Sequence, residues 1–187
     1  MRTTRDTLIE VAARLVDEGG EAAVTLREVG ARAGLSHNAP YKHFADKRDL
    51  LATVAAVELR NLATRIARAV APCRTGIEQV RASARVYLEW AQANPVRFKL
   101  VFGQWGTEPH DELDAAAAEA TSVMYNCVAA AVADRTLRGD PDRIAPMVWS
   151  LGHGAVDLNL ADHLRKKPGA PTPEQLVDDL IDLLGAG

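Results

Sequence analysis

Residues 25–44 read TLREVGARAGLSHNAPYKHF and predict two short helices joined by a glycine turn. Thr25 and Glu28 have the spacing of a capping box, in which each side chain binds a free backbone N–H of the other residue. Gly34 ends this helix, and Ser36 is placed to cap a second helix that runs to about Phe44. The segment therefore predicts a helix-turn-helix.

The flanking sequence also predicts helices, and no window has the alternation of a strand. A longer amphipathic helix precedes the motif from about Thr4 to Glu18, and Asp46 is placed to cap a long helix that ends near Pro72. Further helices are expected at about 75–93, 95–102, 110–137, 141–165 and 173–184. We predict an all-α protein with a three-helix helix-turn-helix domain over 1–50 and a larger C-terminal helical bundle over 51–187.

Composition and charge narrow the class of protein. The chain has 187 residues, of which 48% are apolar, and a net charge of -3, so it is neither disordered nor uniformly basic. Residues 25–48 hold five Lys or Arg against two Asp or Glu, so the local positive excess lies on the motif. Cys73 and Cys127 are far apart, which fits a reducing compartment. With neither a leader nor a membrane span expected, we predict a cytoplasmic protein.

The residue types around the turn suit contacts to double-stranded DNA. The second helix of such a motif presents its N-terminal residues to the major groove, where Asn38 can pair with adenine and Ala39 can touch a thymine methyl. Arg27 can reach a guanine edge or a phosphate. The full set of expected DNA contacts is Arg27, Ser36, His37, Asn38, Ala39, Tyr41, Lys42, His43 and Lys47.

The same residues carry a resemblance. The stretch 25–36, followed by Tyr41-Lys-His-Phe44, Lys47 and Leu50-Leu51, closely resembles the DNA-binding domain of TetR-family transcriptional regulators over residues 5–54. The resemblance implies a homodimer on a palindromic operator, with an effector pocket and a dimer surface in the C-terminal helices. Pro40 stands where most relatives have Leu or Ile, and we expect the helix to survive because proline is tolerated in a first turn.

A shorter match points to one subgroup of that family. The segment Ser36-His-Asn-Ala-Pro-Tyr41 resembles this subgroup, whose later sequence contains Trp, His and Gly. Trp149-Ser-Leu-Gly-His153-Gly154 fits that pattern.

Most aromatic residues lie in the predicted C-terminal domain over 51–187, which favours an apolar effector pocket there. Its candidate residues are Tyr87, Trp90, Phe98, Phe102, Trp105, Met124, Tyr125, Trp149 and His153, with Gln104 and Asp157 as further polar groups. His153 and Asp157 share a helix face, so they suit an orienting hydrogen bond, a ligand contact or half of a metal site. Because no third ligand is evident, we predict neither a metal nor a cofactor.

The last two helices carry dense apolar stripes that predict docking on a partner. The candidate dimer residues are Leu151, Gly152, Ala155, Leu158, Val177, Leu180, Ile181 and Leu184. Glycine inside a helix costs about 1 kcal/mol relative to alanine, so Gly152 and Gly154 predict a close helix crossing.

Three interpretations remain open at this point. The favoured one is a repressor that a small-molecule effector releases from DNA. A second keeps DNA binding but makes the C-terminal domain only a dimerisation module, or makes the protein an activator. The third is a helical enzyme that uses His153, Asp157 and perhaps Cys127, although the sequence supplies no nucleophile–base set and no phosphate-binding loop.

Overall fold

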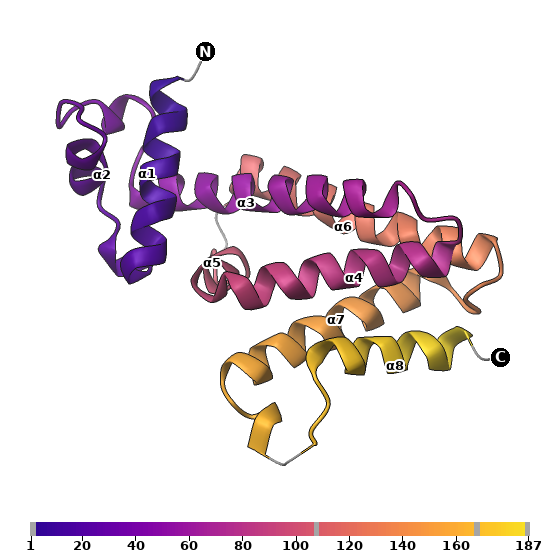
Figure 1. The fold of residues 1–187 in the computed structure, drawn as a ribbon. Helices are drawn as coiled ribbons and strands as arrows, with labels where there is room; N and C mark the ends of the chain where they lie inside the picture. Colours follow the sequence, from indigo (N-terminus) through magenta and orange to yellow (C-terminus); the bar gives the residue numbers. More distant parts are fainter. Residues whose placement is uncertain (1–2, 107–108, 167–168, 186–187) are drawn as a thin grey trace. The chain divides into compact units, whose positions relative to one another are not determined.

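The computed structural model describes residues 3–106, 109–166 and 169–185, and every regular element within those ranges is helical (Figure 1). The α-helices are α1 (Thr4–Gly19), α2 (Leu26–Arg32), α3 (Lys47–Val70), α4 (Gly76–Ala93), α5 (Pro95–Val101), α6 (Asp111–Ala133), α7 (Pro141–Leu160) and α8 (Pro173–Gly185). Three short 3-10 helices lie between them in the described ranges: η1 (Glu21–Ala23), η2 (Pro40–Lys42) and η3 (Leu164–Lys166). The all-α prediction is confirmed.

The chain forms two compact units that interleave along the sequence. The first unit holds residues 1–60 and 94–118, and the second holds 61–93 and 119–187. Helices α3 and α6 each begin in the first unit and end in the second. The predicted boundary near residue 50 stays a prediction, and α5 with the first turns of α6 packs with the N-terminal helices.

Local capping explains where α1 begins and ends. Thr3 and Asp6 form a complete capping box at its N-terminus, and Gly20 (φ +67°) donates its N–H to the carbonyl of Val16. Its buried residues recur three and four apart: Leu8, Ile9, Val11, Ala12, Ala13, Leu15 and Val16. This stripe forms one side of the core of the first unit.

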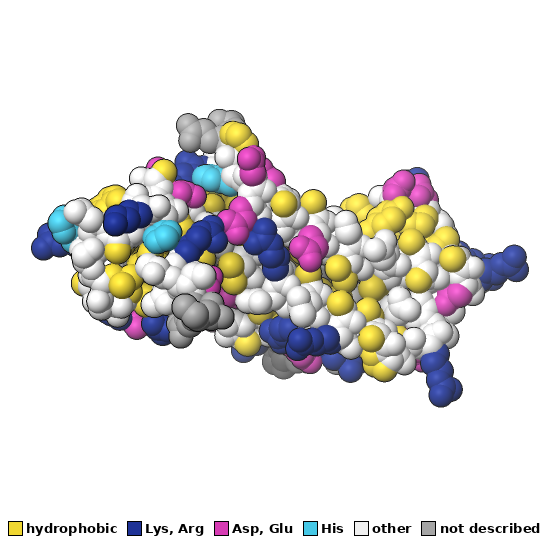
Figure 2. Space-filling view, turned by 90° about the horizontal axis from the view of Figure 1, so that it is seen from above, with side chains coloured by type: hydrophobic (Ala, Val, Ile, Leu, Met, Phe, Trp, Pro, Cys, Tyr) yellow, Lys and Arg dark blue, Asp and Glu magenta, His cyan; other side chains and the backbone are white. Residues whose placement is uncertain are grey.

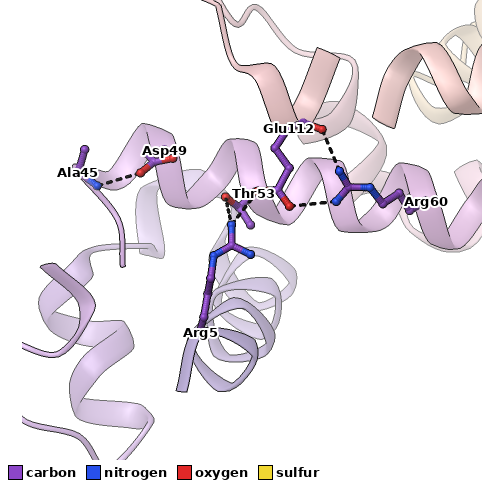
Figure 3. A network of polar contacts seen from close by, with 6 residues as sticks. All are labelled: Arg5, Ala45, Asp49, Thr53, Arg60 and Glu112. Atoms are coloured by element: carbon purple, nitrogen blue, oxygen red, sulfur yellow. Dashed lines mark hydrogen bonds and ion pairs between the residues drawn. The ribbon is translucent and has the colours of Figure 1, made fainter. Parts of the chain in front are cut away.

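Helix α3 is the centre of the first unit. Residues 50–56 are all buried, so this part of the helix is covered on every side. Asp46 accepts the N–H of Asp49 at 2.9 Å, and the Asp49 carboxylate accepts the N–H of Ala45 at 2.8 Å. The predicted Asp46 cap is thereby confirmed, and Figure 3 shows the bond between Ala45 and Asp49.

In the second unit, α7 and α8 lie side by side and both pack on α4 (Figure 1). A Cβ added to Gly152 would meet Leu88 and Val177 at 3.6 Å, so the crossing at this glycine joins helices of one unit. A Cβ on Gly154 would meet nothing within 4 Å, so the close crossing predicted there is absent from the described residues. The start of α4 is held by Asp134, which accepts the N–H of Gly76 at 2.6 Å.

Helix α6 has the length and apolar composition of a membrane span, contrary to the expectation that no segment would. Such a match is weak evidence, because the core helices of proteins without a membrane pass the same test. Asp111, Glu112 and Asp114 lie in its first turn.

Candidate nucleic-acid interface

The turn after α2 brings the two arms of the predicted motif together. Gly34 has φ +68°, a conformation that side chains rarely adopt, and Leu35 donates its N–H to the carbonyl of Gly30 at 3.0 Å. A Cβ on Gly30 would lie 3.0 Å from Cγ of Pro40, so only glycine fits easily between α2 and η2. Pro40 is therefore part of the packing that sets the angle of the motif.

The predicted helix over 36–44 is wrong in its detail. Residues 37–39 form turns, and only Pro40–Lys42 form a 3-10 helix. The N–H of Ala39 bonds to the carbonyl of Ser36, and that of Lys42 to Ala39, which are three-residue spacings. Pro40 has no N–H to donate to an α-helical ladder, which explains the tighter winding.

Only one of the two hydrogen bonds of the capping box predicted for α2 forms. The hydroxyl of Thr25 accepts the N–H of Glu28 at 3.0 Å, as expected. The carboxylate of Glu28 instead accepts from Nε of Arg32 at 2.9 Å, and Arg32 also pairs with Glu18 of α1. Arg32 thereby ties α2 to α1.

The predicted DNA-contact side chains are all exposed or half-buried, and Figure 2 shows Lys, Arg and His side chains on the surface of the first unit, at the left of that view. Tyr41 is 57% exposed although it is a large aromatic residue. The exposed members are Arg27, Ser36, His37, Asn38, Tyr41, Lys42 and His43, and the half-buried members are Ala39 and Lys47. Their accessibility is what a DNA-reading surface requires.

Phe44 anchors this surface to the core. Its side chain is 2% exposed, the His43 ring lies 6.4 Å away, and the guanidinium of Arg5 lies 5.5 Å from its ring centre. A cation over an aromatic face is a favourable contact. The buried ring thus holds the end of η2 against α1.

A carboxylate at the start of α6 joins α1 and α3. Glu112 accepts from Arg5 of α1 at 2.7 Å and from Arg60 of α3 at 2.9 Å, and Arg5 also reaches the hydroxyl of Thr53 (Figure 3). The local sequence did not predict this cluster, because its members are separated by 52 and 107 residues. No local spacing could have indicated it.

Acidification is expected to weaken the Glu112 cluster. Burial raises the pKa of Glu112, but the hydrogen bonds from Arg60 and Arg5 outweigh burial and hold the pKa below its ordinary value. A carboxylate with a lowered folded pKa stabilises the fold above its unfolded pKa of about 4.3, and this contribution is lost as the pH falls through the folded pKa. We expect the Tm difference between the wild type and Glu112→Gln to narrow from about pH 6 to about pH 3 in thermal scans. A constant difference would contradict this role.

A second arginine cluster ties α5 to the same two helices. Arg97 binds both carboxylate oxygens of Asp17 in α1, at 2.8 and 2.6 Å, and donates to Glu58 of α3 at 2.6 Å. Glu58 is only 8% exposed. Local sequence patterns did not predict this cluster, because a charged residue inside an apolar helix gives no sign of its partner.

Four of the predicted effector-pocket residues gather in the second unit. The hydroxyl of Tyr87 lies 2.9 Å from Nδ1 of His153, and the ring centres of Trp149 and His153 are 5.4 Å apart. The ring of Trp90 lies 6.5 Å from Tyr87 and is buried. Burial raises the pKa of Tyr87 and lowers that of His153, so both groups are held neutral at pH 7.

The other predicted pocket residues do not join this group. Phe98, Phe102 and Trp105 belong to the first unit, where the two phenylalanine rings are 5.3 Å apart. Met124 and Tyr125 lie on α6 in the second unit, and Tyr125 is 36% exposed. The pocket set remains a prediction, and its members fall in separate units.

Half of the predicted dimer residues lie inside the second unit itself. These are Gly152, Ala155, Val177 and Ile181. Leu151, Leu180 and Leu184 are half-buried, and Leu158 is 44% exposed. The apolar spacing identified the buried faces of α7 and α8. It did not distinguish the face that packs on α4 from a face that a partner could cover.

Within the described ranges, no group of three or more His, Cys, Asp or Glu could hold a metal ion. Burial lowers the pKa of the His153 imidazole, and the charge of Asp157 opposes this by raising it.

Two protein families match the chain. The family described as bacterial regulatory proteins, tetR family, matches residues 8–54, and the family described as tetracyclin repressor-like, C-terminal domain, matches residues 80–184. Both are families of regulators rather than enzymes. Nothing in these matches separates the Trp/His/Gly subgroup from the rest.

Individual relatives agree with these families. The chain is 27% identical to the HTH-type transcriptional regulator Rv1816 of Mycobacterium tuberculosis, over 96% of this chain and 75% of that protein. A protein of unknown function from Rhodococcus sp. RHA1 has a similar structure, with a TM-score of 0.84, 25% identity and coverage of 99% and 95% of the two chains. FadR of Bacillus subtilis, solved with stearoyl-CoA, has a TM-score of 0.75 at 14% identity, with 97% of each chain covered, and shows the fold alone.

Proposed function

Because the chain belongs to the TetR family of transcriptional regulators, we propose that it is a homodimeric repressor that a small-molecule effector releases from a palindromic DNA operator. The exposed surface from Ser36 to Lys47, held by Phe44 and by the Gly30–Pro40 contact, carries the proposal. Because the proposed function is carried out on DNA, we also propose that the protein is cytoplasmic.

The residues of that surface divide into two roles. Ser36, His37, Asn38 and Ala39 precede the 3-10 turn and suit base edges. Arg27 suits a guanine edge or a phosphate, and Tyr41, Lys42, His43 and Lys47 suit phosphate oxygens, which set the register of the protein on the duplex.

The dimer surface that we propose is the uncovered side of α7 and α8. Met147 is 49% exposed and Leu158 is 44% exposed; eleven residues apart, about three turns, they share one side of α7. Leu183 of α8 is 77% exposed. Large apolar side chains that stay exposed on two neighbouring helices are typical of an interface.

Effector control would reach the DNA surface through α3 and α6, which run from the second unit into the first. In the first unit, Glu112 of α6 pairs with Arg5 of α1, and Glu58 of α3 pairs with Arg97, which also binds Asp17 of α1. A shift of either helix would then move α1 and the motif packed on it. The effector must bind the released state more tightly than the DNA-bound state, or no shift follows.

A DNA-binding titration with Tyr41→Ala tests the proposal. On a duplex taken from the region flanking the gene, we expect Tyr41→Ala to weaken specific binding about tenfold, because it removes a phosphate contact and a rigid aromatic surface. Lys47→Gln should lower the slope of log K against log salt by about 1.

Tyr125→Ala is the matched control, because Tyr125 is an exposed tyrosine on α6 of the second unit. Its affinity for DNA should equal that of the wild type. Equal weak binding of wild type and Tyr41→Ala to every duplex, including those from random-sequence selection with ligand-stripped protein, would refute the proposal.

We propose no catalytic role. The imidazole of His153 is engaged by the hydroxyl of Tyr87 and sits beside Trp149, which suits a structural or ligand contact better than proton transfer.

A further inference from the structure

A cleft of about 420 Å³ lies within the first unit, apart from the Tyr87–His153 group. It opens between the start of α3, the end of α5 with the loop that follows it, and Glu21 of η1. Its size is that of sites for small ligands. Two residues predicted for the effector pocket, Gln104 and Trp105, line it.

The inner part of the cleft is apolar. Leu51 and Leu100 line it and are 3% and 1% exposed, and the half-buried indole of Trp105 forms a wall. The indole is held in place, because its N–H donates to the carbonyl of Val101 at 3.3 Å and its ring packs edge-on against His110. A fixed flat wall beside aliphatic side chains suits a planar ring.

A polar atom beside this wall lacks a protein partner. Nε2 of His110 is buried, and no residue in the described ranges forms a hydrogen bond with it. Unpaired buried polar atoms are uncommon and often mark the place of a water; His110 touches the wall residue Trp105 but does not itself line the cleft.

The rim of the cleft carries two cations without a fixed partner. Lys47 and Arg48 line it, and within the described ranges neither forms an ion pair or a hydrogen bond through its side chain. The guanidinium of Arg48 reaches over Gly106, where a Cβ would come within 2.5 Å of Nη2. Of the two acids on the rim, Asp46 is engaged in capping α3.

We propose that this cleft binds a small planar aromatic acid, with its ring against Trp105 and its carboxylate on Arg48 and Lys47. Charge-assisted hydrogen bonds from a guanidinium are the strong contacts of such a site. The consequence for DNA rests on the proposed function, in which Lys47 contacts a phosphate. The Lys47 ammonium cannot bind the ligand carboxylate and a DNA phosphate fully at the same time. Binding of the ligand and binding of DNA therefore weaken each other.

The test follows the indole N–H resonance of Trp105 in ¹⁵N-labelled full-length protein without DNA, assigned with Trp105→Phe. The probes are 2-naphthoate, its uncharged amide and 2-naphthylmethylamine. We expect a saturable shift with 2-naphthoate and binding at least about tenfold weaker for the other two, since they lack the anionic group. Arg48→Gln should weaken 2-naphthoate about tenfold, and the exposed Arg68→Gln on α3 should leave it unchanged.

Each other outcome overturns the proposal. Absence of a saturable shift at Trp105, equal binding of the three probes, or an Arg48→Gln affinity equal to that of the wild type would each do so. A second titration with the gene-flanking duplex should show 2-naphthoate weakening DNA binding, with reciprocal weakening of the probe. If the protein fails to bind DNA while Trp105 still responds to 2-naphthoate, the proposed function is refuted but the aromatic-acid site in the cleft is supported.

Discussion

Gly76→Ala is expected to lower the free energy of unfolding by about 3 kcal/mol or more, a larger effect than most single substitutions. A Cβ at this position would lie well under 3.0 Å from backbone atoms of Ala130 and Ala131 in α6. Backbone cannot rotate away as the end of a side chain can, so α4 and α6 would have to separate. The separation would also strain the bond from the Gly76 N–H to Asp134.

Denaturant unfolding followed by circular dichroism measures this change at a fixed protein concentration. Gly152→Ala is the matched control, because this buried helical glycine has room for a Cβ at 3.6 Å from Leu88 and Val177. It should be as stable as the wild type or more stable by up to about 1 kcal/mol. An unchanged midpoint for Gly76→Ala would show that the contact between α4 and α6 is looser than described.

Arg97→Met is expected to cost about 3 to 5 kcal/mol, because it leaves the buried carboxylate of Glu58 without its partner. Methionine retains much of the apolar stem of arginine, so lost packing contributes little. The double variant Arg97→Met/Glu58→Leu should regain a large part of the loss, since no buried charge remains.

The matched control is Arg81→Met in the second unit. Arg81 also joins two carboxylates, Asp178 and Asp182, but both are well exposed, so water can replace the arginine and the cost should be about 1 kcal/mol. Urea unfolding of the wild type, Arg97→Met, Glu58→Leu and the double variant gives the coupling energy between Arg97 and Glu58. If Arg97→Met costs no more than Arg81→Met, burial of Glu58 does not govern this cluster.

Local sequence was enough to predict the α-helices that the structure has, but it also predicted one that does not form. Proline after Asn94 begins α5, Asp46 caps α3, and the glycines at 19–20 end α1, as predicted. The helix predicted over 36–44 became a turn and a 3-10 helix, because Pro40 lacks the N–H that an α-helix needs there. The partial capping box at Thr25 has a tertiary cause, since Arg32 draws Glu28 toward its own side chain.

The sequence could group site residues only where they are neighbours in the chain. The surface from Ser36 to Lys47 is one continuous segment, so its exposed residues were found together. The aromatic residues proposed for one pocket fall in two units, because α5 packs with the N-terminal helices. Composition alone cannot say which aromatic side chains share a space.

By itself, the sequence determined the all-α class, the helix-turn-helix and the resemblance to a family of regulators, because caps, turns and apolar spacing act over a few residues. The tertiary structure alone decided that Glu112 joins Arg5 to Arg60, that Arg97 neutralises Glu58, and that Trp105 faces a cleft beside Arg48. These pairings bring together residues far apart in the chain, and their energies depend on burial, which only the packing of helices sets.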